Sequence, residues 1–466
     1  MEYLTRLRQM SLCNKERITL ALMLLLGLFL YIFFAPYYRL SNGDDPWRTS
    51  TVYDIVMRGG INYIRSFIPN MGEDNLLVGT IHAYVYGTIF NIFGWLPIVG
   101  MRISTAFFAL SLLLWWQILK ALNFSKAFTL SILFTMLILE TYFGMASQSR
   151  TDSITFFFVT LAFFLFIRQW YLFSGFVLML AVETHYIGIT GFFYCFAYLL
   201  AYRPNIKRIA IYFTLGVAIG VALYLYLHLD AVIIGFTGTL AKSTGGSITD
   251  SNYLLAYFFR TKYFRHIPEL IIFATALIVF MKQKLYKEVQ GKFILIFLIC
   301  TIVSTLILRR GNFHYAPFTF VALLLITMSV AERYHKIWLL NLLWLALLIP
   351  QYGYVYYKQH TYPGINAYIE MIRQEVPTDL PIFGDSRVWY AFVGREKTHH
   401  MTRLGFVYDD MEKYNYDAFY LTGYDEDTDI PMIDVVNKVS TKYDCTTISE
   451  TEFYNNPVVT WKCIKR

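Results

Sequence analysis

Long apolar runs dominate residues 1 to 354 of the chain. Several exceed the roughly 18 residues that a helix needs to cross a bilayer, and the first is ITLALMLLLGLFLYIFFAPY from Ile18. No cleavage site of small residues follows it, so it is predicted to be a retained helix and not a signal peptide. The pattern predicts eleven spans, near residues 18–36, 100–119, 127–145, 153–168, 171–184, 187–202, 209–227, 267–281, 292–308, 316–331 and 337–354.

The segment LLVGTIHAYVYGTIFNIFGWLP from Leu76 is long enough to span, but glycine, histidine and asparagine interrupt it. Lysine and arginine in short loops stay on the cytoplasmic side. If this segment does not cross, nine of the eleven lysines in residues 1–354 fall inside, and only Lys242 and Lys262 fall outside. We therefore expect a juxtamembrane or re-entrant piece within a first outer loop at 37–99, and a cytoplasmic N-terminus.

Two other segments show different periods. Residues 47–67 read as an amphipathic helix on the outer face, with apolar and arginine positions on opposite sides. In the tail, INAYIEMIRQEV and MIDVVNKVS are helical in pattern, whereas PIFGD, DAFYLTG and NPVVTWKCIKR are typical of strands. The sequence thus predicts a polytopic α-helical membrane domain at 1–354 and a small extracytoplasmic α/β domain at 355–466.

Composition agrees with this division. Of the 466 residues, 56% are hydrophobic and 15% charged, which is typical of a polytopic membrane protein. Residues 1–354 carry 28 basic and 15 acidic side chains, and the tail carries 12 and 17. The basic residues are scattered over short loops, which argues against nucleic acid as a partner. Cys445 and Cys463 could pair if the tail lies in an oxidising compartment, and no metal-ligand spacing appears among the five cysteines.

An adjacent acidic pair, Asp44 and Asp45, follows the first predicted span. A carboxylate within hydrogen-bond reach of an attacking hydroxyl or amine is a suitable general base for sugar transfer. The alternative is an N-cap for the helix of Trp47 onward, with Pro46 at its start. A cap needs one acid, so the second is left without a structural role.

Further polar groups are predicted at outer boundaries of later spans. Arg150 and Asp152 precede one span, and Glu183 and His185 end another, where ionisable residues tend to mark sites. The structural alternative is a helix cap for Asp152 and an anchor among lipid headgroups for Arg150, whereas for Glu183 and His185 it is an interfacial pair solvated by headgroups. A third group precedes the span at 316–331 and consists of Arg309, Arg310, His314 and Tyr315. Arginine suits a phosphate because its planar fork donates in pairs. No nucleotide-binding motif is present, so an activated donor would be held by other means, such as a lipid tail.

Taken in order, these segments resemble the GT-C class of glycosyltransferases that use lipid-linked sugars, especially the branch of protein O-mannosyltransferases and lipid A aminoarabinose transferases. The resemblance lies in the acidic pair, NLLVGTIHAYVYGTIFNIFG, MRISTAFFALSLLLWW, SRTDSITFFF and RRGNFHYAPFTFVALLL, and covers most of residues 15–354. The chain departs from the pattern at Asp45, where the family often has Glu, and at Thr151, where it has Pro. It also has Asp74-Asn75-Leu76 in place of Lys-Pro-Pro or His-Pro-Pro, which leaves His82 as an open candidate for phosphate contact.

The resemblance implies that Asp44 is the catalytic base, with Asp45 beside it. The expected function is transfer of a sugar from a polyprenyl-phosphate donor to an extracytoplasmic glycolipid, glycan or protein, at a bacterial inner or plasma membrane. Candidate phosphate-binding residues are Arg150, Arg260, Arg265, Arg309 and Arg310. Supporting residues are Asp152, His82, Glu183, His185, His314 and Tyr315. A divalent cation could share the phosphate-binding role, although no dedicated cage is visible. The alternative is a transporter or flippase for an anionic glycolipid or polysaccharide precursor.

Overall fold

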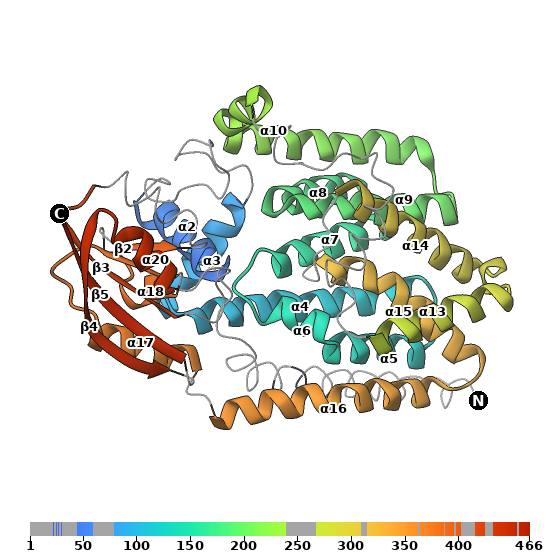
Figure 1. Cartoon of the computed structure of the whole chain (residues 1–466). Coiled ribbons are helices and arrows are strands. Elements are labelled where there is room, and N and C mark those ends of the chain that lie inside the picture. The colour runs from blue at the N-terminus through green and yellow to red at the C-terminus, as the bar shows by residue number, and fades with distance from the viewer. Residues whose placement is uncertain are drawn as a thin grey trace.

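The computed structural model describes residues 44–58, 79–238, 267–308, 315–361, 364–385, 387–395, 398–401, 415–424, 432–453 and 456–466, with Leu22, Leu25, Gly27 and Phe29 of the first predicted span. A helical bundle forms one end of the molecule and a β-sheet forms the other, with α2 (Asp44–Arg58) and α3 (Thr80–Phe93) between them (Figure 1). The bundle consists of α4 (Pro97–Ala121), α5 (Lys126–Ile138), α6 (Glu140–Ala146), α7 (Asp152–Ile167), α8 (Tyr171–Thr184), η1 (Tyr186–Ile189), α9 (Thr190–Tyr202), α10 (Ile206–Gly238), α13 (Ile267–Lys282), η2 (Leu285–Lys287), α14 (Val289–Leu308), α15 (Ala316–Arg333) and α16 (Ile337–Thr361).

Large aromatic and aliphatic side chains fill the bundle interior. Trp115 of α4 is fully buried between Phe163 of α7, Tyr194 of α9 and Phe297 of α14. Such rings add edge-to-face attraction to the area they bury. The bundle core is therefore packed with side chains.

Glycines allow α8 and α10 to pack closely against each other. A Cβ at Gly216 of α10 would lie 2.0 Å from the carbonyl oxygen of Leu172 on α8, and one at Gly175 of α8 would lie 2.3 Å from that of Phe213 on α10. Small residues let membrane helices approach to backbone contact. Further along, α10 kinks at His228, whose φ of −132° and ψ of 18° are non-helical.

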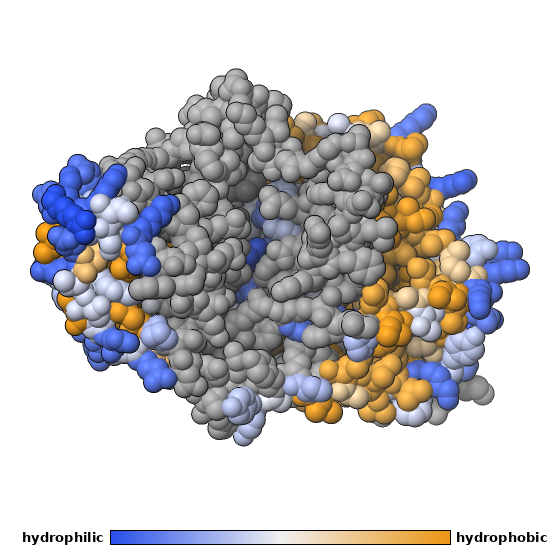
Figure 2. Space-filling model, in the orientation of Figure 1, coloured by the Kyte–Doolittle hydropathy of each residue, from blue (hydrophilic) through white to orange (hydrophobic). Residues whose placement is uncertain are grey.

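Within the described residues, four helices are long and apolar enough to cross a bilayer: 97–121, 206–228, 289–307 and 316–333. A fifth is possible if α5 and α6, bent by 64° at their break, count as one span. Apolar side chains cover the helical end of the surface, and hydrophilic ones cover the sheet end and the far rim (Figure 2). Every predicted span from 100–119 onward overlaps a helix, but the count of eleven and the orientation stay predictions.

The sheet has strand order β2-β1-β3-β5-β4. Its strands are β1 (Ile382–Asp385), β2 (Thr398–Met401), β3 (Ala418–Tyr424), β4 (Tyr443–Phe453) and β5 (Asn456–Lys465), with β1 parallel to β2 and β3 and the other pairs antiparallel. Tyr420 faces a core with α17 (Gly364–Glu375) and α18 (Val388–Ala391), whereas Phe419 and Leu421 face α20 (Met432–Val439). This alternation is the period of two expected of a sheet covered on both sides.

Three details refine the sequence predictions. Helix α2 begins at Asp44, three residues before the predicted start, and ends at Arg58 within the described part; residues 59–67 lie outside it. The segment after Leu76 forms α3 from Thr80 to Phe93, which packs beside α2 and α4 and is not among the span-length helices of the described residues; that it does not cross the membrane stays a prediction. Helix α16 continues to Thr361, past the predicted domain boundary at 354.

Candidate active site

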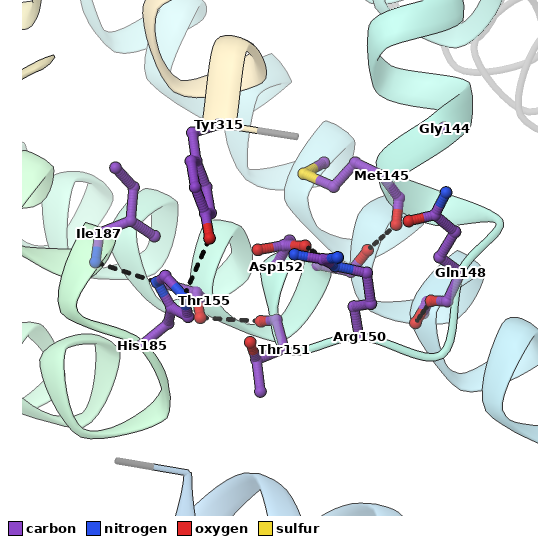
Figure 3. A network of polar contacts seen from close by, with 12 residues as sticks. Gly144, Met145, Gln148, Arg150, Thr151, Asp152, Thr155, His185, Ile187 and Tyr315 are labelled. Atoms are coloured by element: carbon purple, nitrogen blue, oxygen red, sulfur yellow. Dashed lines mark hydrogen bonds and ion pairs between the residues drawn. The ribbon is translucent and has the colours of Figure 1, made fainter. Parts of the chain in front are cut away.

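Arg150 and Asp152 form a buried pair where the loop after α6 meets α7. Nε of Arg150 donates to Oδ2 of Asp152 at 2.7 Å, and the two residues are 8% and 1% exposed (Figure 3). Asp152 opens α7, where a carboxylate is favoured by the helix dipole. Its other oxygen, Oδ1, is buried and has no hydrogen-bond partner among the described residues. The guanidinium thus fixes one carboxylate oxygen of Asp152 and not the other.

Gln148 on the same loop repeats this pattern. The residue is 3% exposed, and neither its side-chain nitrogen nor its side-chain oxygen has a partner within the described part of the chain. Its backbone is held instead, because Oγ of Ser104 donates to its carbonyl at 2.5 Å. A buried amide without partners costs about 1–3 kcal/mol. A polar ligand or bound water would recover that cost.

His185 and Tyr315 lie on the other side of Asp152 (Figure 3). Nδ1 of His185 accepts from the backbone N–H of Ile187 at 3.1 Å, so the ring proton of the neutral form is on Nε2, which lies 3.4 Å from the Tyr315 hydroxyl. Oγ1 of Thr155 on α7 and Oγ1 of Thr184, the residue before His185, are 2.9 Å apart. That contact fixes the ends of α7 and α8 against each other.

The carboxylate of Glu183 makes hydrogen bonds to other parts of the fold. Oε1 accepts from the backbone N–H of Thr80 at 2.6 Å, Oε2 accepts from that of Ile81 at 3.1 Å, and Nε2 of His228 lies 3.0 Å from Oε1. Glu183 is 2% exposed. It therefore caps the N-terminus of α3 and ties it to the kink of α10, which is neither of the roles considered from the sequence.

His82 sits in the first turn of α3, directly after the two residues that Glu183 caps. Its ring packs on Tyr86 with centroids 4.1 Å apart, and the Tyr86 hydroxyl donates to the Arg150 carbonyl at 3.4 Å. His82 is 3% exposed. It thus lies near the Arg150 loop, with Tyr86 between them.

Asp44 and Asp45 are the first two residues of α2. The same helix reaches the site loop, since Oγ1 of Thr49 is 3.4 Å from Oγ of Ser149. A rise of 1.5 Å per residue puts the acids about 6–8 Å along the helix axis from Thr49. The structure therefore brings the start of α2 near the Arg150–Asp152 loop. It includes both acids in the helix and does not place them before it, and the base role of Asp44 stays a prediction.

Five predicted residues lie outside the described part of the chain: Arg260, Arg265, Arg309, Arg310 and His314. Their contribution stays a prediction. Within the described ranges no group of three or more His, Cys, Asp or Glu residues could hold a metal ion. Sequence reasoning missed Gln148 and His228; for His228, a lone histidine inside an apolar helix was the available signal.

The sequence matches no protein-family model and no curated protein. The fold, however, resembles that of solved GT-C glycosyltransferases, which confirms, at the level of the fold, the resemblance seen in the sequence. The long apolar helices indicate an integral membrane protein.

The solved structures it resembles include ArnT from Cupriavidus metallidurans bound to undecaprenyl phosphate, at 12% identity and a TM-score of 0.54 over 94% of this chain and 97% of that one. The apo form of the same protein is 11% identical, with a TM-score of 0.53 over the same shares of the two chains. Another is the oligosaccharyltransferase AglB from Archaeoglobus fulgidus, in complex with an inhibitory peptide and a dolichol-phosphate. It is 11% identical, with a TM-score of 0.50 over 86% of this chain and 69% of that one. At these identities the likeness concerns the fold.

Proposed function

We propose that the protein transfers a sugar from a polyprenyl-phosphate donor to an acceptor on the extracytoplasmic side. The observation that carries the proposal is the buried loop in which Arg150, Asp152 and Gln148 present a guanidinium, a carboxylate oxygen and an amide, the last two without partners in the described chain. These groups suit a sugar phosphate, because the guanidinium matches phosphate oxygens and the other two match hydroxyls. They lie at the end of an apolar bundle that could hold the lipid tail.

In the proposed reaction, the Asp44 carboxylate takes the proton of the acceptor hydroxyl or amine as that atom attacks the anomeric carbon. The bond from this carbon to the phosphate oxygen breaks on the opposite face, with inversion, and polyprenyl phosphate leaves with the electron pair. Arg150 lies where negative charge grows on the departing phosphate, and fixed donors contribute most at such a position. Arg260, Arg265, Arg309 and Arg310 are further candidates for this role, and a divalent cation could share it.

The structure also supports an extracytoplasmic sheet. Cys445 and Cys463 face each other across β4 and β5 and form a disulfide. Disulfides persist in oxidising compartments and are rare in the cytosol. Together with the lysine distribution, this pair supports a sheet, and an adjacent site, outside a bacterial inner or plasma membrane. The sheet would then be available for acceptor docking.

The test is mass analysis of cell-envelope glycolipids and glycans from cells with and without the protein. We expect one lipid-linked sugar to accumulate and one glycosylated product to disappear when the protein is absent. Cells that make the Asp44→Asn variant should match cells without the protein. The control, Asp54→Asn, makes the same chemical change in the same helix and should match wild type. A normal product level with Asp44→Asn would support the transporter alternative.

A further inference from the structure

Helix α2 is enclosed on all sides in its second turn. Thr49, Ser50, Thr51 and Val52 are 1%, 3%, 6% and 1% exposed. Four successive helical residues sweep about 300° around the axis. Three of the four are hydroxyl side chains, so apolar packing alone does not explain this burial. A short helix of such composition is marginal by itself and depends on its neighbours.

Helix α3 supplies one side of the enclosure. Val52 packs in a small core with Ala83, Tyr86 and Phe90 of α3. The approach is close, because a Cβ at Gly87 would lie 2.4 Å from Cγ2 of Val56. This side fixes how far α2 stands from α3.

The sheet end supplies the other side. The hydroxyl of Tyr390 on α18 lies 2.9 Å from Oγ1 of Thr49, and Tyr390 is fully buried. One turn later, the ring of Tyr53 meets Trp95 and Trp389 edge-on, with centroids 4.8 Å and 6.0 Å apart. Figure 1 shows α18 next to α2. Residues more than 300 positions apart in the chain are thus joined at the helix that begins with the acidic pair.

We infer that Tyr390 is a positioning residue: the C-terminal sheet unit holds α2, and with it Asp44 and Asp45, at the Arg150–Asp152 loop. The Thr49 hydroxyl is the junction, since it lies within hydrogen-bond distance of Tyr390 on one side and of Ser149 in the site loop on the other. The inference rests on the proposed function and adds a second role for the sheet unit besides acceptor docking. A docking surface governs acceptor affinity, whereas a positioning contact governs the rate of the bound complex.

The experiment compares Tyr390→Phe with Tyr420→Phe in the full-length protein. Each variant loses one tyrosine hydroxyl from the same unit, and the Tyr420 hydroxyl donates to Asp379 of that unit at 2.8 Å. Hydrogen exchange of the α2 amides is measured first. Sugar transfer is then measured with the donor lipid and acceptor that the envelope analysis identifies.

For Tyr390→Phe we expect α2 amides to exchange about five- to tenfold faster, as loss of one hydrogen bond predicts. We expect kcat to fall by a similar factor, with KM for donor and acceptor within about twofold. Tyr420→Phe should change neither. Thr49→Val should act like Tyr390→Phe, and the double variant should be no worse than either single one.

Unchanged α2 exchange in Tyr390→Phe would overturn the inference, and so would faster exchange with normal kcat. A raised acceptor KM with unchanged kcat would instead assign the sheet unit to docking alone. A wild-type protein that transfers no sugar would defeat the proposed function. The exchange measurement would still report whether Tyr390 holds α2, so the two failures remain distinguishable.

Discussion

Glu183→Gln tests the finding that this buried acid caps the N-terminus of α3 and ties it to α10. The carboxylate accepts from two backbone N–H groups at the start of α3 and contacts His228. Glutamine keeps the size of the side chain but has one acceptor oxygen in place of two. If that oxygen continues to serve Thr80, the amide NH₂ group faces the N–H of Ile81, and two donors oppose each other.

The expected loss of stability follows from these contacts. An unsatisfied buried donor costs about 1–3 kcal/mol, and a lost charge at a helix N-terminus costs about 0.3–1 kcal/mol more. At roughly 2.1 cal/mol/K per residue, unfolding a chain of this length carries an entropy of about 1 kcal/mol/K. The melting temperature of Glu183→Gln should therefore fall by about 1.3 to 4 °C.

The assay is thermal unfolding of purified protein in detergent, followed by intrinsic fluorescence. Glu370→Gln is the control, because Glu370 makes a surface ion pair with Arg373 in which its side chain is 61% exposed. Such pairs contribute little, so we expect a change below about 0.5 °C. If the melting temperature of Glu183→Gln matched that of the control and only substrate binding were lost, the structural role assigned to Glu183 would be wrong.

Three further predictions concern other parts of the chain. Gln148→Leu should leave thermal stability unchanged or higher while weakening the affinity for a lipid-linked sugar about five- to tenfold, measured by ligand-induced thermal shift; weaker stability with normal affinity would contradict a binding role. Cys445→Ser should destabilise the sheet unit by about 3 kcal/mol in chemical unfolding, and reductant should reproduce the loss in wild type. Gly216→Ala should cost about 1–3 kcal/mol in the same assay, because its Cβ would lie 2.0 Å from the Leu172 carbonyl oxygen. Gly353→Ala, whose Cβ would have no atom of the described residues within 4 Å, should cost nothing.

Much of the fold could be predicted because long apolar runs in the sequence identify membrane helices. The tail was also readable where its pattern was regular: PIFGD forms β1, DAFYLTG lies in β3 and MIDVVNKV forms α20. Strands β2 and β4 and helix α18 were missed. THHM and YDCTTISETEF carry few apolar residues, because these are the edge strands of the sheet. β2 and β4 are strands because they pair with β1 and β5, and the local apolar pattern of a segment does not show which strand it pairs with.

Part of the site could also be predicted from the apolar runs. Arg150, Asp152, His185 and Tyr315 stood out as polar groups beside apolar runs, and the fold brings them together. The role of Glu183 could not be read, because its partners come from α3 and α10, over 40 residues away in each direction. Gln148 carries no charge and resembled an ordinary loop residue. Only its burial without partners in the described chain distinguishes it.

The central claim is that this membrane protein breaks the bond between a sugar and a polyprenyl phosphate. The most direct measurement is release of polyprenyl phosphate by purified protein in nanodiscs, with a labelled polyprenyl-phosphate sugar and the acceptor identified in cells. The account predicts that release is equal in amount to acceptor glycosylation and falls at least about a hundredfold in Asp44→Asn. Equal release by Asp44→Asn and wild type, or movement of the intact lipid-linked sugar across the bilayer without release, would contradict it.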